Sequence, residues 1–121
     1  MTENTLYTNN SLSIEWKDSE DAVRLVWTGK SSDRTPGKFI LPILNEALEK
    51  AGKKTIAVNF VDLEYMNSST VSPLVKMLAS AKNANQTVTL EYNKGLKWQE
   101  LSFTALRVFE TADKRIQILG K

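Results

Sequence analysis

The sequence predicts a single α/β domain in which helices pack on a mixed β-sheet. Two kinds of apolar periodicity lead to this fold class: alternating apolar residues mark short strands, and apolar residues spaced three and four apart mark helices. The segments follow the order strand, strand, helix, strand, helix, strand, helix, strand. Helices placed between strands are typical of crossover connections, which join parallel strands.

The first two predicted strands form an antiparallel hairpin. Their alternating apolar residues are Leu12, Ile14 and Trp16 in the first strand and Val23, Leu25 and Trp27 in the second. The polar residues 17–21 between them are short enough for a hairpin connection. We expect Trp16 and Trp27 to pack in the core across this pair rather than to form a stacking surface for a ligand.

The segments that flank the hairpin carry weaker patterns. Residues 1–10 are expected to form a flexible or loosely attached N-terminus, and residues 29–37 to form the longest loop. The first residues have neither the basic nor the apolar segment of a signal peptide.

The first predicted helix begins near Lys38 and ends before Gly52. Its apolar face consists of Phe39, Ile40, Ile43, Leu44, Ala47, Leu48 and Ala51. Pro42 falls in or just after the first turn, where proline is tolerated, and Gly52 suits a helix end. The next strand, residues 55–61, is apolar on both faces at its centre, which is typical of a buried parallel strand.

Two more helices and two more strands complete the predicted fold. One helix, from Val71 to about Asn83, carries the apolar stripe Val71, Leu74, Val75, Leu78 and Ala79. The other helix is predicted from the stripe Leu101, Ala105, Val108 and Phe109. The two strands are expected at residues 88–92 and 116–119.

The composition excludes several classes of function. The 121 residues fit one domain, residues 1–121, and the net charge of +2 is spread over pairs such as Lys53–Lys54, which we interpret as solvated surface. The absence of cysteine and histidine excludes Cys nucleophiles, Ser-His-Asp triads and thiolate or imidazole metal sites. No apolar run approaches the roughly 20 residues of a membrane span. We therefore expect a cytoplasmic, non-enzymatic protein with no catalytic residue, metal or cofactor, and with neither nucleic acid nor membrane as a partner.

The most distinctive motif is a row of hydroxyl groups, Ser68–Thr70, between a strand and a helix. Free N–H groups and the dipole at a helix start stabilise an anion. A serine at this point therefore either caps the helix or carries a phosphate. Asp62 and Glu64 precede the row, and we interpret them as solvated loop carboxylates because no nucleophile or phosphate-binding loop accompanies them.

The stretch from Asn59 to Thr70 resembles the signature of the STAS domain, the anti-sigma-factor antagonist family. That signature is an apolar strand, Asp-Leu, two variable or aromatic positions, an apolar residue, Asp-Ser-Ser-Gly and an amphipathic helix. The element order also agrees, and residues 26–30 are similar to the family's strand and glycine-containing loop. The resemblance implies a non-enzymatic, phosphorylation-switched binding protein in a bacterial partner-switching pathway.

The resemblance also implies a site and partners. The phospho-acceptor carried over by position is Ser68, within the motif Asp62, Asn67, Ser69 and Thr70. Asn67 replaces the usual Asp, Thr70 replaces the Gly, and no C-terminal helix follows the last predicted strand. The Asn-hydroxyl-Ser version is most similar to the biofilm-regulating branch of the family. The implied partners are a serine/threonine kinase or anti-sigma factor of GHKL type, a PP2C-type phosphatase and a target such as a diguanylate cyclase.

The sequence leaves alternatives open. The chain could be a non-phosphorylated STAS scaffold subunit for self- or hetero-assembly, with Ser68 only capping a helix, or a small-ligand or nucleotide-binding module. The alternative fold is a small open α/β domain of flavodoxin type, whose acidic or glycine-rich loop after the first strand is missing here.

Overall fold

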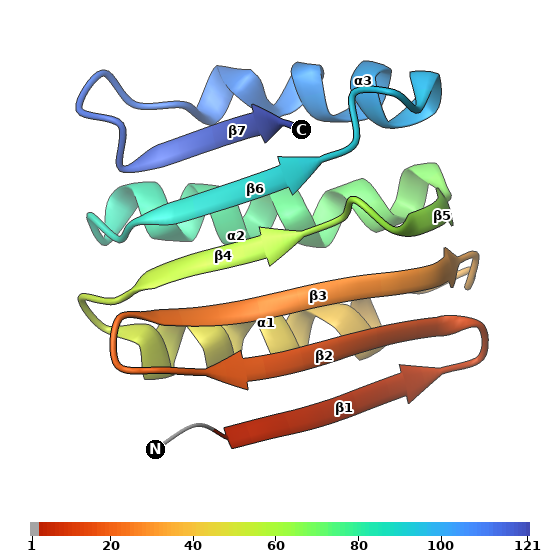
Figure 1. Cartoon of the computed structure of the whole chain (residues 1–121), viewed down its shortest axis with the longest axis horizontal. Coiled ribbons are helices and arrows are strands. Elements are labelled where there is room, and N and C mark those ends of the chain that lie inside the picture. The colour runs from red at the N-terminus through yellow and green to blue at the C-terminus, as the bar shows by residue number, and fades with distance from the viewer. Residues whose placement is uncertain (1–2) are drawn as a thin grey trace.

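The computed structural model describes residues 3–121 and shows a mixed sheet with the helices on one side of it (Figure 1). Its elements are β1 (Glu3–Asn9), β2 (Leu12–Asp18), β3 (Ala22–Ser31), α1 (Gly37–Ala51), β4 (Thr55–Asn59), β5 (Leu63–Met66), the 3-10 helix η1 (Ser68–Thr70), α2 (Val71–Asn83), β6 (Val88–Tyr92), α3 (Lys97–Thr104), the 3-10 helix η2 (Ala105–Phe109) and β7 (Ile116–Gly120). The α/β fold class with helices on a mixed sheet is confirmed. A flavodoxin-type domain would carry helices on both faces.

The strand order is β1-β2-β3-β4-β6-β7, and β5 pairs with the end of β3 beyond β4. β1, β2 and β3 pair antiparallel, which confirms the hairpin of β2 and β3. β4 lies between β3 and β6 and is parallel to both, so the parallel character of this strand is also confirmed. β7 continues the parallel part at the far edge.

Two strands were missed by the sequence analysis. Residues 3–9, expected to be loosely attached, form β1 and pair with β2 along their whole length, so that expectation is wrong for them. The two-residue turn at Asn10 and Ser11 allows this pairing, because Asn10 takes a left-handed conformation (φ 55°) that asparagine tolerates. The second missed strand is β5. Residues 29–31, expected to be loop, continue β3 and pair with β5.

The core lies between one face of the sheet and the helices. Trp16 and Trp27 are both buried there, as expected, and the ring centroids of Trp27 and Phe60 are 4.8 Å apart. Phe103 of α3 lies 4.6 Å from Phe60 and stacks on Tyr92 of β6 at 5.7 Å. The other face of the sheet is open to solvent, so β4 is not buried on both faces as its sequence suggested.

The last helical segment turns a different face to the core from the one predicted. Gln99, Phe103 and Leu106 are buried, whereas Leu101 and Val108 are 67% and 74% exposed. The predicted stripe assumed one continuous α-helix. Leu101 lies two positions from the buried Phe103 and therefore on the opposite side of α3. After Thr104 the chain continues as a 3-10 helix with three residues per turn, so the later spacing does not mark the same face either.

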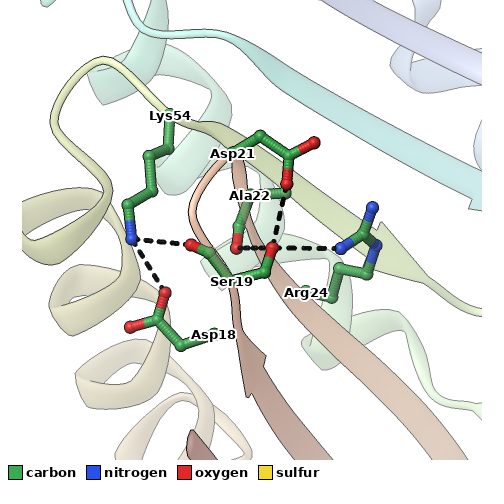
Figure 2. Close-up of polar contacts among 6 residues, drawn as sticks. All are labelled: Asp18, Ser19, Asp21, Ala22, Arg24 and Lys54. Carbon is green, nitrogen blue, oxygen red and sulfur yellow. Dashed lines mark hydrogen bonds and ion pairs between the residues drawn. The ribbon is translucent and has the colours of Figure 1, made fainter. Parts of the chain in front are cut away.

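Lys54 ties the β2–β3 turn to the start of β4 (Figure 2). Its Nζ atom lies 2.9 Å from Oδ1 of Asp18 and 2.9 Å from the carbonyl oxygen of Ser19. The hydroxyl of Ser19 lies 3.0 Å from Oδ1 of Asp21 and 3.1 Å from the carbonyl oxygen of Ala22. The side chain of Lys54 therefore has a structural role and is not only part of the solvated surface.

Candidate functional site

The hydroxyl row lies where β5 passes into α2, at the carboxyl end of the parallel part of the sheet (Figure 1). β5 runs beside the end of β3, with Ser31 opposite Met66. The chain then forms the 3-10 turn Ser68–Thr70, which leads directly into α2. The carboxyl edge of parallel strands is the usual position of binding sites in α/β folds.

Asn67 caps this helical segment. Its Oδ1 atom accepts hydrogen bonds from the N–H of Thr70 at 3.1 Å and from the hydroxyl of Thr70 at 2.8 Å. Its Nδ2 atom donates to the main-chain carbonyl oxygen of Asp33 at 2.7 Å. The cap is therefore Asn67 and not Ser68, and both ends of the Asn67 amide are used.

Thr70 is buried beneath the row. Its hydroxyl oxygen lies 2.7 Å from that of Ser31, and both residues are almost fully buried. Because the Thr70 hydroxyl donates to Asn67, the Ser31 hydroxyl must donate to Thr70. The N–H of Asn67 donates to the carbonyl oxygen of Ser31 at 2.9 Å. This network removes Thr70 from contact with solvent or with any enzyme.

Ser68 and Ser69 are exposed. Within residues 3–121, no hydrogen bond involves either side chain. Neither serine side chain caps the helical segment, because Asn67 performs the capping. The geometry thus separates Thr70 from the two serines and leaves both serine hydroxyls open to solvent.

The other residues of the motif precede the row in the chain and show no polar contact with one another within residues 3–121. Asp62 and Glu64 are exposed, and neither side chain makes a hydrogen bond or an ion pair within the described residues. Tyr65, next to the row, is 47% exposed. No group of three or more carboxylates in residues 3–121 is arranged to hold a metal ion.

The loop of residues 32–36 is a part of the site that the sequence analysis missed. Oδ2 of Asp33 accepts a hydrogen bond from Nδ2 of Asn9 at 3.2 Å, and this bond is the main cause that lowers the pKa of the Asp33 carboxyl below its ordinary value of 3.8. The main-chain carbonyl of the same residue accepts the bond from Asn67. Asp33 therefore links the β1–β2 hairpin to the helix cap beside Ser68.

A second missed residue, Gln99 of α3, fixes the chain that leads to the site. Its buried Nε2 atom donates to the carbonyl oxygens of Phe60 at 2.7 Å and Leu63 at 2.9 Å. Its Oε1 atom accepts from the N–H of Asn93 at 2.7 Å. These bonds attach the irregular segment between β4 and β5 to helix α3. Its spacing of four from Phe103 was the one signal in the sequence that could have placed Gln99 on the buried face.

Comparison with known proteins adds no assignment. No protein-family model matches the sequence, and a search of curated proteins gives no match. None of the helices within residues 3–121 combines the length and the hydrophobicity needed to cross a membrane. The resemblance to the STAS family therefore depends on residues 59–70, on residues 26–30 and on the element order.

Proposed function

We propose that the chain is a non-enzymatic STAS-type binding protein that is switched by phosphorylation of Ser68 in a bacterial partner-switching pathway. The observation that carries this proposal is the division of roles among the polar residues of the junction. Asn67 caps the helix, Thr70 is buried and bonded, and Ser68 is exposed with a free hydroxyl. The alternative in which Ser68 only caps the helix loses support, since Asn67 has that role.

An exposed hydroxyl suits a kinase, because the enzyme must bring its phosphoryl donor in line with the acceptor oxygen. Nothing in the described residues has to unfold for Ser68 to be reached. Asn67 in place of the usual Asp also removes one negative charge next to the acceptor. Its Nδ2 bond to the carbonyl of Asp33 is one that a carboxylate could not make.

The phosphate would act on partner binding through charge. It adds about −1.5 to −2 charges at neutral pH beside the exposed carboxylates of Asp62 and Glu64. A partner that places a carboxylate or an apolar surface there would be repelled or would have to strip water from the phosphate. The same surface, with Tyr65 exposed on it, remains available in the unmodified protein.

The proposed partners follow from the resemblance. They are a serine/threonine kinase or anti-sigma factor of GHKL type, a PP2C-type phosphatase that removes the phosphate, and a downstream target such as a diguanylate cyclase. The chain acts in this scheme by binding alone.

Site mapping tests the proposal. The protein is co-expressed with a candidate kinase of GHKL type, separated by phosphate-affinity electrophoresis and examined by intact-mass and peptide analysis. We expect one phosphate on the wild type and on Ser69→Ala, and none on Ser68→Ala. If phosphate is still found on Ser68→Ala but not on Ser69→Ala, the phospho-acceptor is Ser69 and not Ser68. A complete lack of phosphate with an active kinase would contradict the proposal.

A further inference from the structure

The two edge strands of the sheet, β1 and β7, differ in how far their outward-facing backbone groups are hydrogen-bonded. At the β7 edge, Ile116 exchanges hydrogen bonds with Thr111: its N–H donates to Oγ1 at 3.1 Å, and its carbonyl accepts from the Thr111 N–H at 3.3 Å. The N–H of Ile118 donates to Oε2 of Glu110 at 3.0 Å. These bonds occupy backbone groups that could otherwise pair with another strand, which is a common way to block edge-to-edge association.

The β1 edge has no such protection among the described residues. β1 is seven residues long, pairs only with β2, and keeps a continuous register without a bulge. It contains no lysine or proline, the residues that most often blunt an edge strand. At its centre, Leu6 is 64% exposed, although it is a large apolar residue.

We propose that β1 pairs antiparallel with β1 of a second copy of this chain, about a two-fold axis at Leu6. Because Leu6 is the central residue, this register uses all seven residues of each strand. It places Leu6 opposite Leu6, Thr5 opposite Tyr7, and Glu3 opposite Asn9, so that no like charges face each other. An isologous contact of this kind closes after two copies.

Self-complementarity is the reason to choose a second copy over a foreign strand. In the register centred on Leu6, the two exposed leucines cover each other on the open face of the sheet, opposite their own copies. β2 and β3 separate β1 from β5, so the dimer leaves the Ser68 junction free. The proposed dimer contact uses no residue of the Ser68–Thr70 row, so its test is separate from that of the proposed phosphorylation.

Single-cysteine cross-linking tests the axis directly, since the chain contains no cysteine. Opposed residues of an antiparallel pair have Cα atoms about 4.5–5.5 Å apart, which a disulfide can span. Under mild oxidation we expect Leu6→Cys to form a covalent dimer, whereas Leu101→Cys, equally exposed on α3, stays largely monomeric. Equal cross-linking of the two variants, or none at position 6, would overturn the proposal.

Sedimentation velocity between about 1 μM and 1 mM tests the dimer without a covalent bond. We expect reversible dimerisation of the wild type and of Leu101→Lys, and a monomer for Leu6→Lys, whose two new charges would face each other. Thermal melts at low concentration should be the same for the two lysine variants. Two results would overturn the proposal. One is a wild type that stays monomeric at all concentrations, which is expected if only a foreign strand binds β1. The other is a dimer that Leu6→Lys does not weaken.

The register itself is tested by a charge pair. In the proposed register Asn4 lies opposite Thr8 of the other copy, twice per dimer. The double variant Asn4→Glu/Thr8→Lys should therefore dimerise about two- to tenfold more tightly than the wild type. Weaker dimerisation of this variant would exclude the register centred on Leu6.

Discussion

The hydroxyl oxygens of Ser31 and Thr70 lie 2.7 Å apart in the interior, so that the end of β3 is bonded to the start of the helical segment beside Ser68. The contact joins residues 39 positions apart in the sequence. Together with Asn67 it forms a directed chain of hydrogen bonds from Ser31 through Thr70 to the cap. In the proposed switch, this buried network would hold the junction in place while the exposed Ser68 gains charge.

Removing one member of the buried hydroxyl pair should destabilise the protein. Thr70→Val keeps the shape of the side chain but leaves the Ser31 hydroxyl without a partner. We expect a loss of about 1–3 kcal/mol in the free energy of unfolding, measured by denaturant melts. Ser69→Ala, a control at an exposed neighbour, should stay within about 0.5 kcal/mol of the wild type. Equal stability of both variants would show that the pair contributes nothing.

Asn67→Asp should destabilise the protein although it restores the residue usual in the STAS family. The carboxylate can still accept from Thr70, but it cannot donate to the carbonyl of Asp33, and it sets a negative charge against that oxygen. We expect a loss of about 1–3 kcal/mol at pH 7 in denaturant melts. If Asn67→Asp were as stable as the wild type, the Asn67–Asp33 hydrogen bond would not contribute to the free energy of unfolding.

Gln99→Leu should be among the most damaging substitutions outside the apolar core. It leaves the carbonyl of Leu63 and the N–H of Asn93 without their side-chain partner, whereas the carbonyl of Phe60 keeps the N–H of Leu63. With about 1–3 kcal/mol for each of these two unsatisfied groups, we expect a loss of at least about 2 kcal/mol. The matched control is Gln117→Leu on the open face of β7, which should change stability by about 0.5 kcal/mol or less.

The Asp33 carboxyl should titrate below its ordinary value of 3.8 because Asn9 donates a hydrogen bond to it. A lowered pKa in the folded state means that the ionised form stabilises the fold. This contribution is complete above 3.8 and is lost as the pH falls through the lower pKa of the folded protein.

Side-chain NMR titration should show the pKa of Asp33 rising toward 3.8 in Asn9→Ala. Asp113 is an internal control, since hydrogen bonds from Thr111 and Arg115 lower its pKa to about 2 without any contact to Asn9. An Asp33 pKa that does not respond to Asn9→Ala would remove the link between the hairpin and the loop.

Leu74→Ala should cost about 2–5 kcal/mol, because Leu74 is fully buried between α2 and the sheet and its truncation leaves a cavity. The same change at Leu101, which is 67% exposed, should have little effect. A comparable loss for both variants in denaturant melts would mean that the assigned faces of α2 and α3 are wrong.

The fold could largely be predicted because most of its elements carry strong apolar periodicity. The bounds of α2, Val71–Asn83, agree with the predicted helix, and β4 has the predicted parallel neighbours. β1 could not be predicted, since only Leu6 and Tyr7 of its seven residues are large and apolar. It is held by pairing with β2, which local pattern does not reveal.

The site could be predicted in its position but not in its internal roles. The place of the hydroxyl row at a strand-to-helix junction was evident from the flanking patterns. The identity of the cap had a local signal, because an Asn three residues before Thr70 is well placed to accept its N–H. Ser31 and Asp33 had none, since each acts on the site through a partner more than 30 positions away. Gln99 had only its spacing of four from Phe103, which indicates the buried face but not its distant partners Phe60 and Leu63.

The central claim is tested most directly by measuring how the phosphate on Ser68 changes binding. The unmodified and the quantitatively phosphorylated protein are titrated calorimetrically against the same partner, the kinase that phosphorylates Ser68, with Ser68→Ala and Ser69→Ala as references. We expect the unmodified protein and both alanine variants to bind alike, and the phosphorylated protein to bind at least about tenfold more weakly, which is about 1.4 kcal/mol. Equal affinities of the phosphorylated and unmodified forms would contradict the account.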